Sequence, residues 1–343
     1  MFLSTLTHPQ DKAEKGNRGP IAVLGAGSWG TALALLAASK GIPAYLWARR
    51  PEHALAMQLE RQNHEYLPGV RFPEALYPTA NAEEALHQAQ FAVVAIPSKA
   101  LRETLGGLPK AKAYVSVIKG LHFSDHHLLR MSQVIEKVTG VSQIAVLSGP
   151  NLAEEIARFL PAAAVVAAQD PALAHQVQQV FSGESFRVYT STDRVGVELG
   201  GALKNVIALA AGMVDGLGLG NNAKAALITR GLREIVRFGV TQGAQEATFM
   251  GLSGLGDLIA TAHSPCSRNR TAGEQVVKGL TLAQLEAQKA VVEGIYTVKA
   301  LHAWDRATGA DLPITEAVYR VIYEGASPLQ ELSRLMTREA KPE

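Results

Sequence analysis

Short apolar runs alternate with helix-compatible segments from Ile21 to about residue 190. Each run has the length of a buried strand and is bounded by Gly, Pro or polar residues. Strands that alternate with helices form a parallel sheet with helices on both faces, so the pattern predicts a doubly wound α/β sheet. The five clearest runs are IAVLGA, PAYLWAR, FAVVAIP, AYVSVIK and IAVLSGP, and AAAVVAA and SFRVYTS are candidate strands near the end of the sheet.

From about Asp193 the pattern changes to long Ala-, Gly- and Leu-rich helical segments with few strand signals. At 343 residues the chain is longer than one typical domain. We therefore expect a sheet-containing domain over 20–192 and an all-α C-terminal domain over 193–338. A flexible extension is expected over 1–19, because its apolar start is too short for a secretory signal.

The most membrane-like segment is VGVELGGALKNVIALAAGMVDGL, but Glu198 and Lys204 interrupt it. A membrane span needs ~18 or more apolar residues without such charges, so we expect a buried helix and a protein that is not membrane-embedded. The formal net charge of +2, from 33 basic and 31 acidic residues, gives no reason to expect nucleic-acid binding. The single cysteine, Cys266, excludes an intrachain disulfide and favours a reducing compartment, so a cytoplasmic location is expected.

Three glycines, Gly25, Gly27 and Gly30, form a G-x-G-x-x-G pattern between the first strand and a helix. Gly25 permits the tight turn, Gly27 lets the backbone approach a pyrophosphate, and Gly30 lets the helix lie close to the strand. The helix N-terminus then faces the phosphates. This context predicts a Rossmann-like dinucleotide-binding domain, the alternative being an ordinary glycine-rich turn.

The end of the second predicted strand carries Arg49 and Arg50, where an acidic residue would bind the ribose 2′-hydroxyl of NAD. An arginine at this point suits a 2′-phosphate, so we expect NADP(H) to be accepted and preferred over NAD(H). The alternative is a solvated arginine pair on a loop.

Polar residues follow three further strands, whose carboxyl ends meet at one crevice of such a sheet. Pro97 and Ser98 follow one strand, Lys119 the next, and Ser148 to Asn151 the third. Lys119 is a candidate donor to a substrate oxygen, or else an ordinary surface lysine. Asn151 with Glu154 resembles a helix N-cap with its capping-box partner.

Lys204 lies in an otherwise apolar helical segment, with Gly200 and Gly201 on the same face. We expect this bare face to leave room for a ligand beside the amine. A lysine retained in such surroundings tends to lose its charge, which makes Lys204 a candidate for proton transfer. The alternative is a lysine at the helix rim with an exposed head group.

The segment GLSGLGDLIATAHSPCSRNR combines a glycine-rich turn, containing Asp257, with a cluster of polar residues. Arg presents a bidentate fork, and with a neighbouring amide it suits a small phosphorylated or carboxylated ligand. Cys266 has no adjacent base and is treated as incidental. The polar cluster consists of Ser267, Arg268, Asn269 and Arg270.

Six motifs in order resemble those of the bacterial NAD(P)-dependent glycerol-3-phosphate dehydrogenases, between Ile21 and about residue 335. They are GAGSWGTALA, SGP followed by AEE, LGGALKNVIALAAGM, GLGDL, SRNR and VVEG. The resemblance implies a Rossmann-like domain followed by an all-α substrate domain, as in 6-phosphogluconate dehydrogenase. It also implies reversible reduction of dihydroxyacetone phosphate to sn-glycerol 3-phosphate for phospholipid synthesis, and a homodimer.

The resemblance implies functional roles for the residues of this chain that match the family's motifs. It implies that Lys204 is the proton-transfer residue. Asn151 and Leu152 depart from the hydroxyl and aromatic residues usual after SGP, and the segment before Ile21 lies outside the family pattern. Substrate contacts fall on Lys119, Gly149, Asn151, Lys204, Asp257, Ser267, Arg268 and Asn269. Dinucleotide contacts fall on Gly25, Gly27, Ser28, Trp29, Gly30, Arg49, Lys119, Ala153, Arg268, Val292 and Glu293.

Two other functions stay open at this point, a hydroxyacid dehydrogenase of the 6-phosphogluconate type and a non-catalytic nucleotide sensor. A sensor has no use for Lys204 or for the SRNR segment. A short-chain reductase is excluded because no tyrosine is followed four positions later by lysine. The chemistry needs no metal, and the sequence shows no cluster of metal ligands.

Overall fold

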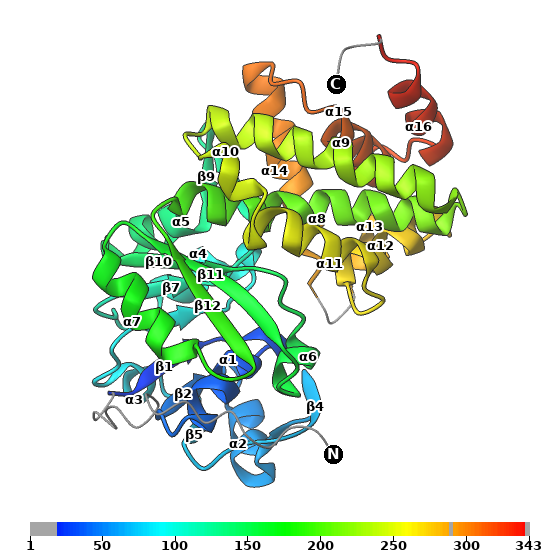
Figure 1. Ribbon diagram of the computed structural model, residues 1–343. Helices are drawn as coiled ribbons and strands as arrows, with labels where there is room; N and C mark the ends of the chain where they lie inside the picture. The colour runs from blue at the N-terminus through cyan, green and yellow to red at the C-terminus, as the bar shows by residue number, and fades with distance from the viewer. Residues whose placement is uncertain (1–18, 288–290, 340–343) are drawn as a thin grey trace, which may run out of the picture.

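The computed structural model describes residues 19–287 and 291–339 and has a sheet-containing part joined to a helical part (Figure 1). The predicted extension over 1–19 lies outside these residues except for Gly19. Eight strands form one sheet in the order β12-β11-β10-β7-β6-β1-β2-β5. The strands are β1 (Ile21–Leu24), β2 (Ala44–Trp47), β5 (Leu76–Thr79), β6 (Ala92–Val94), β7 (Tyr114–Ser116), β10 (Ile144–Ser148), β11 (Ala162–Ala168) and β12 (Phe186–Ser191).

Six neighbouring strands of this sheet run parallel, in the order β5-β2-β1-β6-β7-β10. This is the strand order of a Rossmann domain. The order reverses between β1 and β6, which is the point where such sheets bind ligands beyond the strand ends. Alternate residues of β1 pack into separate cores on the two faces: Ile21 and Val23 on one, Ala22 and Leu24 on the other. Burial on both faces explains the continuous apolar runs in the sequence.

The sheet confirms the predicted fold class but is not parallel throughout. β11 pairs antiparallel with β10, and β12 is parallel to β11, so the last two strands run opposite to the rest. Only the five-residue helix α6 (Ala153–Ala157) lies between β10 and β11, and the chain turns back beside β10 instead of crossing over.

The sequence patterns missed β5 and two small hairpins. β5 contains Pro78, which lowers strand propensity but is tolerated because β5 is an edge strand. The hairpins pair β3 (Gln62–Asn63) with β4 (Leu67–Arg71), and β8 (Leu121–Ser124) with β9 (His127–Arg130). Their residues are too few or too polar to stand out as apolar runs.

Helices cover both faces of the sheet (Figure 1). Their N-terminal residues are often Pro or follow a polar cap, as at α3, where Asn81 accepts two backbone N–H groups. The helices of this part, besides α6, are α1 (Ser28–Ser39), α2 (Pro51–Glu60), α3 (Ala82–Leu86), the short η1 (Ser98–Ala100), α4 (Leu101–Gly106), α5 (Met131–Thr139) and α7 (Pro171–Phe181).

The helical part is built around α8 (Arg194–Gly216), which is capped by Asp193 through the N–H of Gly196 at 2.8 Å. By length and composition α8 is the one described helix that qualifies as a membrane span, but its apolar window is wholly buried inside the protein. The remaining helices are α9 (Gly220–Thr241), α10 (Glu246–Phe249), η2 (Leu252–Gly256), α11 (Asp257–His263), α12 (Arg268–Val277), α13 (Leu282–Glu286), α14 (Glu293–Thr308), α15 (Pro313–Tyr323) and α16 (Pro328–Met336).

Two glycines allow α8 and α12 to cross with their backbones in contact. A Cβ atom added to Gly212 would lie 1.9 Å from the carbonyl oxygen of Arg270, and one added to Gly273 would lie 2.0 Å from that of Leu209. No side chain fits at either position. This close crossing therefore fixes the position of the N-terminus of α12 relative to α8.

Candidate active site

The glycine turn joins β1 to α1. Gly25 has a φ of +117°, and a Cβ atom on Gly30 would lie 2.0 Å from the carbonyl oxygen of Gly25. A Cβ atom on Gly27 would meet nothing within 4 Å, and no side chain caps the N-terminus of α1 among the described residues. The turn thus leaves an open approach to free backbone N–H groups, which suits a phosphate.

The residues beside this turn differ in their partners. Ser28 donates its hydroxyl to the carbonyl oxygen of Tyr66 at 2.7 Å. The indole N–H of Trp29 is buried and has no hydrogen-bond partner among the described residues, which is costly unless a ligand accepts it. The guanidinium of Arg50 pairs with Glu65, whereas Arg49 is exposed and forms no ion pair with a described residue.

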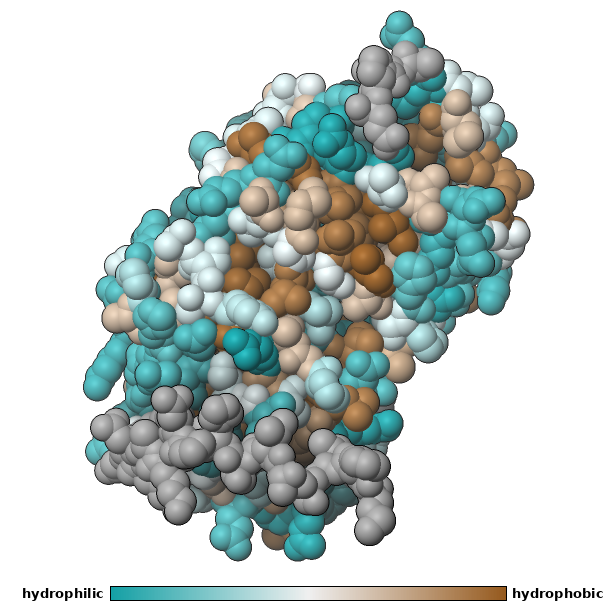
Figure 2. Space-filling view, in the orientation of Figure 1, coloured by the Kyte–Doolittle hydropathy of each residue, from teal (hydrophilic) through white to brown (hydrophobic). Residues whose placement is uncertain are grey.

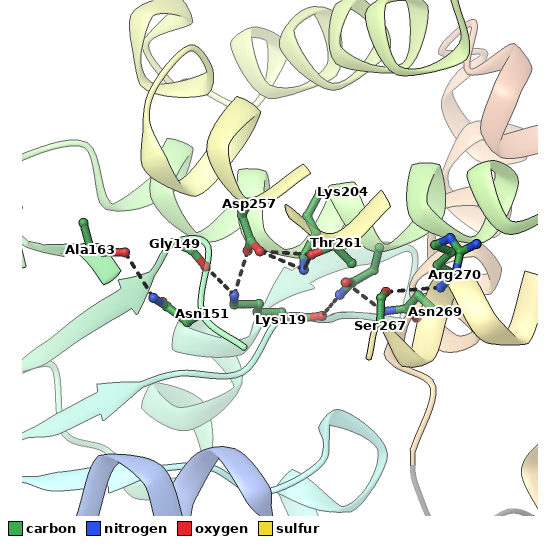
Figure 3. Close-up of polar contacts among 11 residues, drawn as sticks. Lys119, Gly149, Asn151, Ala163, Lys204, Asp257, Thr261, Ser267, Asn269 and Arg270 are labelled. Carbon is green, nitrogen blue, oxygen red and sulfur yellow. Dashed lines mark hydrogen bonds and ion pairs between the residues drawn. The ribbon is translucent and has the colours of Figure 1, made fainter. Parts of the chain in front are cut away.

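A cluster of two lysines and one aspartate lies where the sheet meets the helical part (Figure 3). Lys119 follows β7, Lys204 lies in α8, and Asp257 begins α11. The amine of Lys119 contacts Asp257 at 2.6 Å and the carbonyl oxygen of Gly149 at 2.9 Å. The amine of Lys204 lies 3.0 Å from the other carboxylate oxygen of Asp257. One carboxylate thus bridges both lysines.

Thr261 completes this cluster and was not found from the sequence. Its hydroxyl accepts from the amine of Lys204 at 2.5 Å and donates to Asp257 at 3.1 Å. Thr261 lies one turn after Asp257 in α11, so it shares a face with that carboxylate. A spacing of four residues from a proposed carboxylate is the signal that would have identified it.

Burial lowers the pKa of Lys204 from 10.5 to about 8, because the charged amine loses its water. The attraction of Asp257 opposes this shift, while the charges of Lys119 and Arg268 add to it. Lys204 is only 5% exposed, so it is a buried residue and not a lysine at the helix rim. An amine with this pKa exchanges its proton near neutral pH.

The glycines beside Lys204 do not leave the open space that was expected. A Cβ atom on Gly200 would lie 2.8 Å from the carbonyl oxygen of Ser253, and one on Gly201 would lie 2.5 Å from the hydroxyl of Ser148. The bare face of α8 is therefore filled by η2 and by the end of β10. The glycines bring these elements close to Lys204 instead of making room for a ligand.

Asn151 does not form the expected helix cap. α6 begins one residue later than expected, with Leu152 in the N-cap position and Ala153 in its first turn. The side-chain amide of Asn151 donates to the carbonyl oxygen of Ala163 at 3.1 Å, which fastens the loop to β11. Its side-chain oxygen is buried without a partner among the described residues. That oxygen is available to a ligand.

The SRNR segment forms the N-terminus of α12. Ser267 caps the helix by accepting the N–H of Arg270 at 3.2 Å. Asn269 donates to Asn205 at 2.9 Å and accepts from the N–H of Gly294 at 2.9 Å, so its amide ties α8 to α14. Asn205, which the sequence patterns missed, donates in turn to the carbonyl oxygen of Lys119 at 2.8 Å.

The two arginines of this segment differ. Arg270 contacts Asp215 at 2.6 Å and Glu274 at 2.7 Å, so its charge is used within the protein. Arg268 is exposed, makes no ion pair with a described residue, and acts electrostatically on Lys204 and Glu293. Arg268 is therefore the arginine that is free to bind an anion.

Val292 and Glu293 begin α14. Val292 is buried in the N-cap position. The carboxylate of Glu293 accepts the backbone N–H of Ser98 at 3.0 Å and its hydroxyl at 2.5 Å. Burial raises the pKa of Glu293. Glu293 thus fastens the start of α14 to the start of η1, in the segment that follows β6.

The Rossmann strand order, the open glycine turn and the buried Lys204 close to Lys119 define an NAD(P)-dependent oxidoreductase. Models of the N-terminal and C-terminal parts of NAD-dependent glycerol-3-phosphate dehydrogenase match residues 20–174 and 193–333. The chain belongs to the NAD-dependent glycerol-3-phosphate dehydrogenase family. This confirms the predicted resemblance and enzyme class, and it removes the nucleotide-sensor alternative.

Individual relatives are similar to this chain over nearly its whole length. The glycerol-3-phosphate dehydrogenase [NAD(P)+] of Thermus thermophilus is 59% identical over 323 residues, which is 94% of this chain and 99% of the relative. That of Deinococcus radiodurans is 53% identical over 321 residues, or 94% and 96% of the two chains. The crystal structure of the Coxiella burnetii glycerol-3-phosphate dehydrogenase superposes with a TM-score of 0.88 at 36% identity and covers 94% of this chain and 100% of its own.

Metal ligands do not cluster in the part of the chain that the structure describes. Among residues 19–287 and 291–339 no group of three or more His, Cys, Asp or Glu side chains is placed to hold a metal ion. The polar groups of the described site include the amines of Lys119 and Lys204, the carboxylate of Asp257 and the side-chain amides of Asn205 and Asn269.

Proposed function

We propose that this chain carries out the reaction of its family, the reversible NAD(P)H-dependent reduction of dihydroxyacetone phosphate to sn-glycerol 3-phosphate, with Lys204 moving the proton. The supporting observation is the buried amine of Lys204, with a pKa of about 8, held by Asp257 and Thr261. Its product is the glycerol backbone from which glycerophospholipids are made.

The dinucleotide fits the glycine turn, because Gly27 leaves space above free N–H groups and the indole of Trp29 lacks a partner. When bound, the nicotinamide supplies the hydride. The residues proposed to hold the dinucleotide are Gly25, Gly27, Ser28, Trp29, Gly30, Arg49, Lys119, Ala153, Arg268, Val292 and Glu293.

The protein's own part in the reaction is to stabilise and protonate the oxygen that gains negative charge at C2. The ammonium of Lys204 does both, and Lys119 adds positive charge on the other side of Asp257. In the direction of oxidation the neutral amine of Lys204 takes the hydroxyl proton. Asp257 keeps the two lysines in place throughout, since it contacts both.

The phosphate of the substrate is proposed to bind at the N-terminus of α12. Arg268 is unpaired among the described residues, and the amide of Asn269 keeps a second hydrogen after bonding to Asn205. Fixing the phosphate there orients the carbonyl carbon, which accounts for much of the rate of such reactions. The residues proposed to contact substrate are Lys119, Gly149, Asn151, Lys204, Asp257, Ser267, Arg268 and Asn269.

The reaction is tested by following NADPH and NADH consumption by the purified protein with dihydroxyacetone phosphate. The reverse reaction is tested in parallel with glycerol 3-phosphate and with 6-phosphogluconate, each with NADP+. Turnover with dihydroxyacetone phosphate and glycerol 3-phosphate, and none with 6-phosphogluconate, is the expected result. Turnover with 6-phosphogluconate alone would assign the site to the hydroxyacid alternative.

The oxidation of glycerol 3-phosphate should accelerate with rising pH. Because oxidation needs the neutral amine of Lys204, kcat/KM should rise about tenfold per pH unit below pH 8 and level off above it. Reduction needs the ammonium, so its kcat/KM should fall above pH 8. Initial rates in both directions between pH 6 and pH 10 measure this. Parallel profiles in the two directions would argue against Lys204 as the titrating group.

NADP(H) preference is proposed to depend on Arg49. The variant Arg49→Ala should raise KM for NADPH about tenfold, the equivalent of one charge-assisted hydrogen bond, and leave KM for NADH unchanged. Arg50→Ala is the matched control, because Arg50 is already paired with Glu65. An equal change for both cofactors, or a larger effect in the control, would contradict this role of Arg49.

We also propose that the protein is located in the cytoplasm and forms a homodimer. The single cysteine supports a reducing compartment. Figure 2 shows hydrophobic residues gathered on the visible face of the helical part, and exposed apolar surface of this kind often marks an interface. The exposed large apolar residues of the helical part are Val240, Met250, Ile259, Leu329 and Met336.

A further inference from the structure

The short turn between β3 and β4 lies beside the glycine turn and is fastened to it. The buried side-chain amide of Asn63 donates to the carbonyl oxygen of Ala26 at 2.9 Å and to the hydroxyl of Thr31 at 2.8 Å. The hydroxyl of Ser28 donates to the carbonyl oxygen of Tyr66, at the end of the turn, at 2.7 Å. These hydrogen bonds hold the turn next to the proposed dinucleotide site.

Glu65 lies in this turn and pairs with Arg50. A terminal nitrogen of Arg50 donates to a carboxylate oxygen of Glu65, and the two side chains are 43% and 28% exposed. Burial opposes the ionisation of Glu65, but hydrogen bonds from Arg50 and Tyr66 lower its pKa, so the carboxylate is charged at neutral pH. An ion pair exposed to this degree contributes little to stability. The turn does not need this pair to keep its place, because the hydrogen bonds of Asn63 already fix it.

The pair lies where a Rossmann domain meets the ribose that carries the 2′-substituent. Arg49 and Arg50 follow β2, and the residues at this strand end distinguish a 2′-phosphate from a 2′-hydroxyl. Arg49, Arg50 and Glu65 all act electrostatically on the phenol of Tyr66, so the three charges lie around one point. Their net charge is +1, because Glu65 offsets one of the two guanidinium groups. Among the described residues, only Arg50 of the two arginines has its charge paired.

We propose that Glu65 sets the cofactor preference by keeping Arg50 away from the 2′-phosphate of NADP(H). This inference rests on the proposed dinucleotide site. With Glu65 present, the 2′-phosphate meets one free guanidinium, that of Arg49, and a carboxylate that repels it. NAD(H) carries an uncharged hydroxyl at the same place and is affected by neither. Glu65 therefore reduces the difference in affinity between the two cofactors.

The variant Glu65→Gln tests this role, because it keeps the size of the side chain and removes its charge. Arg50 then becomes available to the 2′-phosphate, and Kd for NADPH should fall about tenfold, the equivalent of one charge-assisted hydrogen bond. Kd for NADH should stay within about twofold of that of the unaltered protein. Titration of NADPH and NADH fluorescence without substrate measures both constants. Calorimetry with adenosine 2′,5′-bisphosphate and adenosine 5′-monophosphate should show the same contrast without a nicotinamide.

Two further variants serve as controls. Glu52→Gln removes the same charge from a carboxylate that lies 4.0 Å from the Nε of Arg50 and is 72% exposed. Because this contact is longer and more exposed, Kd for NADPH should stay within about twofold. Arg50→Ala combined with Glu65→Gln removes the released guanidinium as well. The double variant should therefore lose the tighter binding of NADPH that Glu65→Gln alone gains.

Unchanged NADPH binding by Glu65→Gln, or an equal gain for both cofactors, would overturn this role of Glu65. Weaker NADH binding with unchanged NADPH binding would show that Glu65 accepts the ribose hydroxyl, and would overturn it as well. The binding measurements need no turnover. A chain that binds as expected but does not reduce dihydroxyacetone phosphate would contradict the proposed reaction and leave the role of Glu65 intact. Absence of nucleotide binding by the unaltered protein would overturn both.

Discussion

Lys204→Ala is expected to lower kcat with dihydroxyacetone phosphate by about 10²–10⁴-fold, the contribution of a positioned acid–base group. The loss should be catalytic and not structural. Asp257 keeps its 2.6 Å contact with Lys119 in this variant, so no buried carboxylate is left without a cation. The measurement is NADPH consumption at saturating substrate, with circular dichroism to show that the variant is folded.

Lys224→Ala is the matched control for this experiment. Lys224 is also a buried lysine of the helical part, and it contacts Asp215 at 2.8 Å. Arg270 contacts the same carboxylate, so Asp215 stays paired when Lys224 is removed. The control should keep kcat within about twofold of the unaltered protein, as remote substitutions do. Near-normal turnover by folded Lys204→Ala would remove Lys204 from the mechanism.

Gly212→Ala is expected to destabilise the protein by about 3 kcal/mol or more, at the upper end of what overpacking costs. The new Cβ atom would lie 1.9 Å from the carbonyl oxygen of Arg270, and backbone cannot move aside as a flexible side chain can. The α8–α12 crossing must then widen. A fall of several degrees in melting temperature, followed by circular dichroism, is the result that checks this.

Gly106→Ala provides the comparison for Gly212→Ala. Gly106 also lies in a helix, and a Cβ atom there would meet only Val138, at the ordinary distance of 3.7 Å. Removing backbone freedom without a clash should leave stability unchanged or slightly higher. If both substitutions changed the melting temperature equally, the close crossing would not be the cause of the loss.

The strands that could be predicted from the sequence are those buried on both faces. β1 and β6 are continuous apolar runs because helices cover both sides of the sheet, and this holds whatever their neighbours are. β5 was missed because its position at the sheet edge, which makes Pro78 acceptable, is known only once the sheet is assembled. The direction of β11 likewise depends on how the short connection through α6 packs.

The site residues likewise fall into two groups, those whose geometry is set by neighbours in the sequence and those whose geometry depends on distant segments. The glycine turn is local, so its geometry follows from residues that are adjacent in the chain. The partners of Lys204 come from α11, far along the sequence, and the glycines beside it proved to serve packing against Ser253 and Ser148. Sequence reasoning singled out Lys204 as a lysine in an apolar helix, but its expectation of open space beside the amine was wrong, because the neighbours that fill the space come from distant segments.

The bridging position of Asp257 has a consequence for the charge of the buried site during a reaction cycle. With both lysines protonated, the group of Lys119, Lys204 and Asp257 carries a net charge of +1, which attracts an anionic substrate. When Lys204 gives up its proton, as we propose, Lys119 alone balances Asp257 and the group is neutral. In the proposed mechanism this group of three residues therefore never holds an unbalanced negative charge, and the gain and loss of one proton change its net charge between +1, which attracts an anion, and zero.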